Sequence, residues 1–370
     1  MKITFPHLGY CSIPLRTLFA ELGHTVIVPP PISQKTISLG TLHGPEFACY
    51  PLKLGLGNFI EALEAGADTL IMGGGIGPCR FGYYAQVQQD ILRSLGYEFE
   101  MIVIEPPLGH FRQVVAAAGR LKQKNSWMQL AQAASFALAK LRACDDLHQL
   151  SLKIRPRVEN KAVLANLYNR ALTAIDAADS HRTLKTVANR FQENIKALPQ
   201  TRVEPLKVAL VGEVYLLAEP AANLAIEEKL GNLGVEVIRH VYISSWLKVN
   251  ILLDFLRLRR KESAEQAARP YLNCFVGGHG QHSVGETIQA VRDGLDGVVH
   301  VYPFTCTPEI VARGIMRTYA AEKNMPLICF SLDEHSAEAG FNTRLEAFVD
   351  VMQRKNGQGE LTDEQALHGI

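Results

Sequence analysis

The 370-residue chain is 47% apolar and 20% charged, with a formal net charge of +1. A chain of this length exceeds what one hydrophobic core usually supports, so we expect two α/β domains and an additional segment. The balanced charge does not favour nucleic acid as a partner, and no apolar run reaches the ~18 residues of a spanning helix, so we expect no membrane partner either.

The cysteine content favours a reducing compartment. The seven cysteines are an odd number spread over a large chain, which is not typical of a disulfide framework. The first residues, Met1-Lys-Ile-Thr-Phe-Pro6, indicate a short strand and a turn rather than a signal peptide. We therefore expect the protein in the cytoplasm.

Residues 1–110 alternate short apolar runs with helical patterns, which predicts a first α/β domain with a mostly parallel sheet. The expected strands cover 3–5, 24–28, 69–72 and 99–104. The expected helices cover 13–22, 33–39, 56–65 and 83–95, the second of them capped by Ser33. Ligands of such sheets bind beyond the carboxyl ends of the strands, and Cys79 follows one of these ends.

Residues 111–205 predict a helical connector. Glycine nearly vanishes after Gly119, and residues 111–200 hold 15 Lys and Arg against 6 Asp and Glu. One interpretation of this excess is a set of solvated basic faces. The other is a surface for an acidic partner or for the phosphates of a nucleotide-like substrate.

Residues 206–356 predict a second α/β domain, followed by a polar, frayed tail over 357–370. The expected strands cover 206–213, 235–241, 297–302 and 326–330. The expected helices cover 221–233, parts of 246–268, a stretch ending near 293, a helix capped by Thr307, and 343–353. The two halves look like variants of one plan, so we expect Cys79 and Cys306 at equivalent edges of two domains that face each other across a cofactor cleft.

Three cysteines, Cys49, Cys79 and Cys306, each lie near a junction between a loop and a helix. A helix N-terminus lowers the pKa of a thiol and offers N–H donors to sulfur, so the three could converge on an iron–sulfur cluster. Their spacing is not a compact C-x-x-C run, so buried thiols and a catalytic thiol stay open as alternatives. Of the others, Cys11 could reach the site, whereas Cys144, Cys274 and Cys329 look structural.

The loop over 275–285 is rich in glycine but completes no nucleotide motif. Glu286 stands where a P-loop requires its lysine, and Ser283 stands where a dinucleotide fingerprint requires its third glycine, so a nicotinamide enzyme is not expected. The loop N–H groups suit an anion, and His279 or His282 suits proton donation. A tight turn with solvated histidines is the alternative.

A second polar group, Asp333-Glu-His335, directly follows an expected strand. That position suits acid–base chemistry, and ordinary surface polarity explains it equally well. We take His279, Glu334 and His335 as the candidate catalytic residues.

Several motifs together resemble the 2-hydroxyacyl-CoA dehydratase superfamily, and the branch they resemble most is the acyl-CoA dehydratase activase-related, or CoA-activase-like, branch. They span both α/β regions and are Pro29-Pro-Pro-Ile32, Pro45-Glu-Phe-Ala-Cys-Tyr-Pro-Leu-Lys53, Gly77-Pro-Cys-Arg-Phe-Gly-Tyr-Tyr84, Gly277-Gly-His-Gly280, Pro303-Phe-Thr-Cys-Thr-Pro-Glu309, and Leu332-Asp-Glu-His335 with Arg344-Leu-Glu-Ala-Phe348.

The resemblance implies two Rossmann-like domains that clasp a [4Fe–4S] cluster, with Cys49, Cys79 and Cys306 as ligands and one iron left open. A sister branch carries a double-cubane cluster, which is the alternative cofactor. The same motifs contain Lys53, Gly77, Arg80 and Gly278, which we expect to contact the cofactor.

The resemblance also implies partners and chemistry. Electrons would come from a separate ATP-hydrolysing activase with its own cluster, and the protein would form a homodimer or a heterodimer with a paralogous subunit. In dehydratase relatives, one injected electron generates a ketyl radical and water leaves a 2-hydroxyacyl-CoA, so an acyl-CoA or another small molecule is the expected substrate. Two alternatives stay open: a non-catalytic electron relay or maturation partner, and a two-domain ligand-binding module without a cluster.

Overall fold

The structure, a computed structural model, describes residues 1–75, 77–247 and 263–357. It contains two four-stranded sheets in which every strand pairs in parallel, so the predicted α/β class is confirmed. The strands of the first sheet are β1 (Lys2–Thr4), β2 (Thr25–Val26), β3 (Thr69–Gly73) and β4 (Glu100–Ile104). Those of the second are β5 (Leu206–Gly212), β6 (Val235–Ile238), β7 (Gly297–Pro303) and β8 (Leu327–Leu332).

The two sheets have the same strand order. The first runs β2-β1-β3-β4 and the second runs β6-β5-β7-β8, so each places its first and third strands side by side at the centre. The strand order reverses between these two strands, and ligands of open parallel sheets bind there, beyond the carboxyl ends. Cys79 follows β3 and Cys306 follows β7, so the two cysteines hold equivalent positions, as the sequence predicts.

The first sheet is covered by α1 (Ser12–Glu21), α2 (Gln34–His43), α3 (Tyr50–Glu64), the 3₁₀ turn η1 (Arg80–Tyr83) and α4 (Tyr84–Ser94). Ser33 caps α2 in a capping box with Thr36, as predicted. The predicted start of α3 at residue 56 is wrong, because the helix begins directly after Cys49. Its glycines lower helix propensity but allow close packing, since a Cβ at Gly57 would stand 2.1 Å from the carbonyl oxygen of Thr36.

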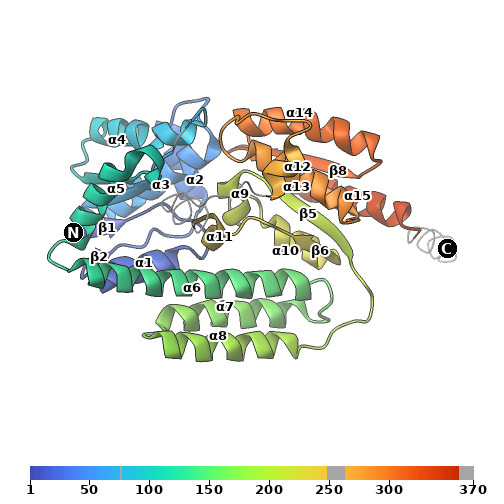
Figure 1. Ribbon diagram of the computed structural model, residues 1–370, viewed down its shortest axis with the longest axis horizontal. Helices are drawn as coiled ribbons and strands as arrows, with labels where there is room; N and C mark the ends of the chain where they lie inside the picture. The colour runs from blue at the N-terminus through green and yellow to red at the C-terminus, as the bar shows by residue number, and fades with distance from the viewer. Residues whose placement is uncertain (76, 248–262, 358–370) are drawn as a thin grey trace.

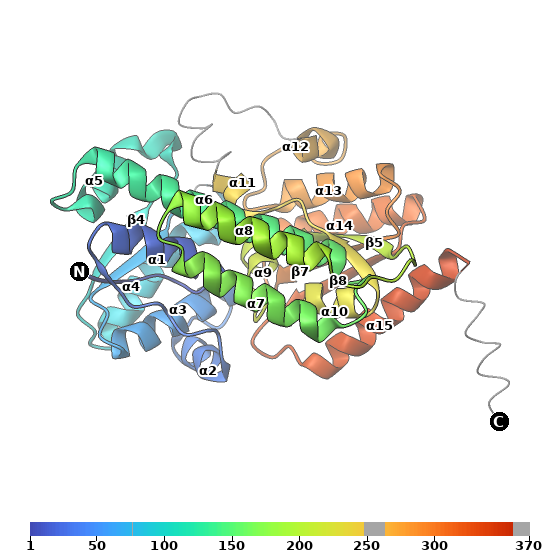
Figure 2. The same cartoon turned by 90° about the horizontal axis from the view of Figure 1, so that it is seen from below.

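The helical segment consists of α5 (Pro107–Lys122), α6 (Trp127–Ile154), α7 (Lys161–Ala177) and α8 (His181–Lys196). Helices α6, α7 and α8 pack on one another around their own apolar core. Figures 1 and 2 show them as a layer beneath the two sheets. Helix α6 packs against α1 of the first half and β6 of the second, so the segment contacts both halves.

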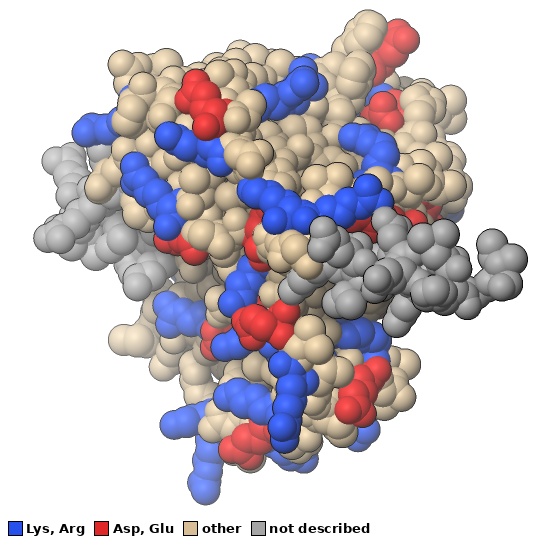
Figure 3. Space-filling model, turned by 90° about the vertical axis from the view of Figure 1, so that its right-hand side faces the viewer, with Lys and Arg blue, Asp and Glu red and all other residues tan. Residues whose placement is uncertain are grey.

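Several basic side chains of this segment form ion pairs with the second half. Arg155 pairs with Glu228 and Arg157 pairs with Glu236, while a further pair of Arg157, with Glu204, stays within the helical segment. On the face in Figure 3, Lys and Arg are interspersed with Asp and Glu. The proposed surface for an acidic partner stays a prediction.

The second sheet is accompanied by α9 (Val214–Ala218), α10 (Ile226–Asn232), α11 (Ile243–Leu247), α12 (Ser263–Ala268), α13 (Gly280–Arg292), α14 (Thr307–Glu322) and α15 (Glu338–Lys355). The predicted helix over 221–233 is wrong in its first part, where Leu224 and Ala225 have φ angles of 58° and 54°. Helix α13 begins inside the glycine-rich loop. Parts of the predicted helices over 246–268 and most of the predicted tail lie outside the described residues.

Tyr50 and Leu54 of α3 are buried in the main core of the second half. The N-terminal turn of α3 therefore joins the first half to the second, and it carries Cys49 to their boundary. Among the described residues, no helix is long and apolar enough to cross a membrane.

Candidate functional site

Arg80 follows Cys79 in the chain, and its side chain contacts the segments that carry the other two predicted ligands, Cys49 and Cys306. Its Nη2 donates to the Sγ of Cys49 at 2.7 Å and to the carbonyl oxygen of Thr305 at 2.7 Å. Because both bonds start from one atom, that sulfur and that oxygen lie no further apart than twice 2.7 Å. Arg80 directly follows Cys79 and Thr305 directly precedes Cys306, so the three cysteines come from three segments that this guanidinium holds together.

The glycine-rich loop packs against Cys79. A Cβ at Gly277 would stand 2.8 Å from the backbone nitrogen of Cys79, and one at Gly278 would stand 3.7 Å from its Sγ and 3.3 Å from Pro308 in α14. Gly277 has a φ of 91°, a conformation that favours glycine. The loop therefore bridges the first half, at Cys79, and the helix that Cys306 begins.

Gly77 lies at the rim of the same region. Its φ is 91°, and a Cβ there would stand 2.6 Å from the ring of Phe275, which is exposed. The structure thus brings Gly77, Arg80 and Gly278, three of the four predicted cofactor-binding residues, to the surroundings of Cys79.

Each of the three cysteines occupies the position before the first residue of a helical turn: Cys49 before α3, Cys79 before η1 and Cys306 before α14. The prediction that Thr307 caps α14 is wrong, because Thr307 is the first helical residue and no side-chain hydrogen bond closes the turn. Cys49 and Cys306 are buried and Cys79 is half-buried.

A donor faces each sulfur. Burial raises the pKa of the Cys79 and Cys306 thiols, whereas the backbone N–H groups of Phe81 and Glu309, respectively, act in the opposite direction and favour the thiolates. The guanidinium of Arg80 donates a hydrogen bond to the Sγ of Cys49. Without a cation at this place, burial keeps the thiols of Cys79 and Cys306 protonated at neutral pH.

Sequence reasoning missed Glu213, which lies in this region. Its carboxylate caps α9 by accepting from the N–H groups of Tyr215 and Leu216 at 3.0 and 3.1 Å. Burial raises the pKa of Glu213 to about 7, and its charge raises the pKa of both Cys79 and Cys306. The available signal was its place directly after β5, at the point where the strand order reverses.

The backbone beside Cys306 is strained. Thr305 has a φ of 64°, which is rare for a β-branched residue, and Arg80 bonds both its carbonyl oxygen and its hydroxyl. Strain of this kind concentrates at functional sites, where the surrounding contacts hold it.

Lys53 and Glu334, predicted separately as cofactor-binding and catalytic residues, form an ion pair with each other. Lys53 also donates to the carbonyl oxygen of Glu46 at 3.1 Å. The third residue of that polar group, His335, is exposed, and its backbone N–H donates to Asp333 at 3.0 Å.

His279 immediately precedes α13 and is 8% exposed, so the alternative of a solvated histidine is wrong. Its ring stacks on His282 with 4.4 Å between centroids. Its Nε2 lies 3.9 Å from Glu286 Oε1 and has no hydrogen-bond partner. His279 adjoins Gly278, so it borders the surroundings of Cys79.

The remaining cysteines have different neighbours. The charged and titratable groups around Cys11 include Cys144 and Asp145 of α6, and both thiols are buried. Cys329 lies in β8 beside His300, and Cys274 is exposed. None of these arrangements adds a fourth sulfur to the group around Arg80.

Within the described residues, no group of three or more His, Cys, Asp or Glu is arranged to hold a single metal ion. A four-iron cluster makes a different demand, because each cysteine binds a separate iron and the sulfurs do not converge on one point. Three thiols at helix starts, each facing a donor, fit the chemistry of cluster ligands. Comparison of the chain with protein-family models and with curated proteins found no match.

Proposed function

We propose that this chain is an iron–sulfur protein of the 2-hydroxyacyl-CoA dehydratase type, with Cys49, Cys79 and Cys306 as the ligands of a [4Fe–4S] cluster. The observation that carries the proposal is the contact of one guanidinium, that of Arg80, with Cys49 Sγ and with the backbone beside Cys306. A cluster bound there supplies a one-electron carrier with one iron open to a substrate.

The protein residues around the thiols suit such a carrier. The positive charge of Arg80 and the N–H groups of Phe81 and Glu309 stabilise thiolates, which are the form that binds iron. Glu213, when ionised, adds negative charge beside them, and negative charge disfavours the uptake of an electron. An ionised Glu213 would lower the reduction potential of such a carrier, which agrees with an ATP-hydrolysing activase as electron donor, whereas Arg80 and the N–H donors would raise it.

The reaction in this proposal is a radical dehydration or a difficult reduction of an acyl-CoA or another small molecule in the cytoplasm. Gly277 and Gly278 pack against Cys79, and His279 directly follows them. The proton donor and the N–H groups of the glycine-rich loop therefore come from one segment. The chain would work with the activase, and as a homodimer or beside a paralogous subunit.

Anaerobic purification with iron and sulfide analysis tests the cluster. We expect about four iron atoms per chain after reconstitution. Cys79→Ser and Arg80→Met should lower the iron content, whereas Cys329→Ser, a matched thiol in β8, should leave the spectrum unchanged. A colourless protein without iron after reconstitution would refute the proposal, and loss of the spectrum in Cys329→Ser would refute the ligand set.

Turnover separates a catalyst from an electron relay. The reconstituted protein is mixed with an activase, ATP and a reductant, and 2-hydroxyacyl-CoA or small unsaturated molecules are offered. We expect substrate consumption that His279→Gln reduces without changing the iron content. A cluster that is fully reduced without any turnover would identify the relay.

A further inference from the structure

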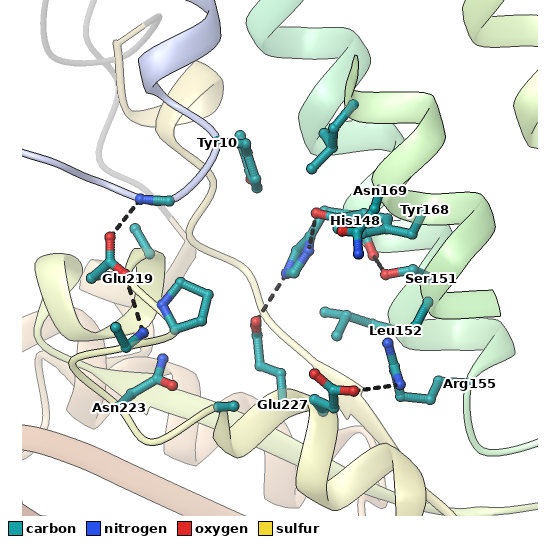
Figure 4. A pocket seen from close by; sticks show the side chains of 18 of the residues that line it. Tyr10, His148, Ser151, Leu152, Arg155, Tyr168, Asn169, Glu219, Asn223 and Glu227 are labelled. Carbon is teal, nitrogen blue, oxygen red and sulfur yellow. Dashed lines mark hydrogen bonds and ion pairs between the residues drawn. The ribbon is translucent and has the colours of Figure 1, made fainter. Parts of the chain in front are cut away.

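A pocket whose lining includes none of Cys49, Cys79 and Cys306 lies where the three parts of the chain meet. It has a volume of about 400 Å³, which is within the usual range for ligand pockets. Its walls come from the loop after β1, from α6 and α7, and from the region between α9 and α10, as Figure 4 shows. The charged residues of this lining are Arg155, Arg239, Glu219, Glu227 and Glu228, and the aromatic ones used below are Tyr10, His148 and Tyr168.

Two backbone segments approach each other closely beside this pocket. Gly9 has a φ of 49°, and a Cβ there would stand 2.5 Å from the carbonyl oxygen of Ala218. On the opposite wall, Ala225 adopts a φ of 54° just before α10. Left-handed residues of this kind persist where the surroundings hold them, often beside a ligand site.

The acceptors of the pocket are already occupied. Glu219 Oε2 contacts His7 Nδ1 and accepts from the Gly9 N–H, each at 2.7 Å, and its Oε1 accepts from the Ala221 N–H at 3.1 Å. Glu227 has His148 Nε2 at 2.9 Å on one oxygen and accepts from Arg239 Nη1 at 2.9 Å on the other. Neither carboxylate is left free to bind a cation.

The aromatic hydroxyls are occupied too. Tyr10 donates to Asp145 at 2.6 Å. When His148 carries its proton on Nε2 toward Glu227, its Nδ1 accepts from the Tyr168 hydroxyl at 3.1 Å. Figure 4 shows this chain of contacts from Tyr168 through His148 to Glu227.

The guanidinium groups of Arg155 and Arg239 have N–H donors that no acceptor among the described residues meets. Arg239 is 5% exposed, and its Nε is buried without a hydrogen-bond partner. Arg155 is 7% exposed, and only its Nη1 bonds within the described part of the chain, to Glu228 at 3.2 Å and Asn232 at 3.3 Å. The Nε of Arg239 is enclosed by protein, so the donors that a ligand in the pocket can meet are the remaining N–H groups of Arg155.

The apolar and aromatic residues of the pocket wall indicate that most of the ligand is apolar. Leu152, Leu172 and Pro220 line the pocket, and the rings of Tyr10 and His148 lie 5.6 Å apart on one side of it. Apolar and aromatic walls with a few oriented polar groups suit an organic molecule that carries one polar end.

The charge of the lining restricts that polar end. Two arginines, Arg155 and Arg239, face three glutamates, Glu219, Glu227 and Glu228, so with neutral histidines the lining is negative by one charge. This excess repels any anion, and it repels a phosphate dianion about twice as strongly as a carboxylate, which also matches the fork of a guanidinium.

We propose that this pocket binds a small organic carboxylate with an apolar body, whose carboxylate accepts from the guanidinium of Arg155. The site does not depend on the cysteines or on a cluster, so its test is separate from that of the proposed function.

Isothermal titration calorimetry of the full chain with sodium butanoate, hexanoate and benzoate tests the proposal. Probe concentrations extend to about 10 mM, because ligands of this size bind in the millimolar range or tighter. We expect binding of at least one carboxylate, and no binding of its neutral amide or of inorganic phosphate. Equal binding of acid and amide, preferential binding of phosphate, or no binding of any acid would overturn the proposal.

Three variants locate the site. Arg155→Gln should weaken carboxylate binding at least tenfold, and Ala165→Trp should abolish it by filling the pocket without a change of charge. Lys153→Gln removes one positive charge from an exposed position of the same helix outside this pocket, so it should bind like the parent. Circular dichroism checks that each variant is folded, and unchanged affinity in a folded Ala165→Trp variant would place the ligand elsewhere.

Discussion

Lys53 of α3 and Glu334, which follows β8, form an ion pair that joins the two α/β halves. Their side chains are 3% and 11% exposed. Lys53 lies one helical turn after Cys49, so the pair holds the start of α3, and with it Cys49, against the second half. A contact outside the thiols therefore fixes the relation between the halves at the candidate site.

Replacement of Lys53 by Met should destabilise the fold strongly. The variant leaves the half-buried carboxylate of Glu334 without its cation, and the cost of breaking a fully buried pair, about 3–5 kcal/mol, is the upper limit of the loss. Urea unfolding followed by circular dichroism measures the change. The double variant Lys53→Met/Glu334→Leu removes both charges and should recover most of the loss; if it unfolds as readily as the single variant, lost packing rather than charge explains the effect.

His300 should make the protein less stable at high pH. Its Nε2 lies 2.9 Å from Glu309 Oε2, and both side chains are fully buried. Burial alone lowers the pKa of this histidine, but the neighbouring Cys329 and the bonded Glu309 outweigh burial and raise the pKa to about 9. The folded value exceeds the ordinary 6.5, so the stabilisation is complete below about pH 6.5 and is lost as the pH rises through 9.

The shift corresponds to at most about 3 kcal/mol of unfolding free energy. Urea midpoints measured across that interval should fall with pH in the parent protein. His300→Gln retains a hydrogen-bond donor but does not titrate, so its midpoints should change less. Parallel slopes in the two proteins would exclude His300 as the titrating group.

Protonation of Glu227 should lower the free energy of unfolding at acid pH. Burial raises its pKa, but the charges of Arg239 and His148 prevail and lower it to about 2. The folded value lies below the ordinary 4.5, so this stabilisation is present above about pH 4.5 and is lost as the pH falls through 2, about 3 kcal/mol in total. Glu227→Gln should flatten the acid limb of the stability curve. Glu204→Gln, at an exposed ion pair, should leave that limb unchanged.

Two helical glycines should respond oppositely to alanine. A Cβ at Gly57 would stand 2.1 Å from the carbonyl oxygen of Thr36, so Gly57→Ala must separate α2 from α3 and should cost about 1–3 kcal/mol. Gly314 lies in α14 with nothing within 4 Å, so Gly314→Ala should add up to about 1 kcal/mol. Thermal unfolding of both variants measures the contrast, and a stabilised Gly57→Ala would mean that the helices are further apart than described.

Local features of the sequence predicted much of the fold. The apolar runs around β3, β5 and β7 and the cap at Ser33 were found because each depends on residues that are neighbours in the chain. Errors occurred where packing outweighs propensity. The first turns of α3 were missed, and there Tyr50 and Leu54 are buried in the core of the second half, a contact that no local pattern shows.

By itself, the sequence determined two parallel-sheet halves, a helical segment, and three cysteines placed next to helix starts. Only the tertiary structure decided which side chains meet. Arg80 reaches Thr305 across 225 positions, and Lys53 reaches Glu334 across 281. Such pairs depend on how whole elements pack and which charges are buried together, and no local pattern of residues records that. The identity of the cluster ligands stays a prediction that iron analysis tests.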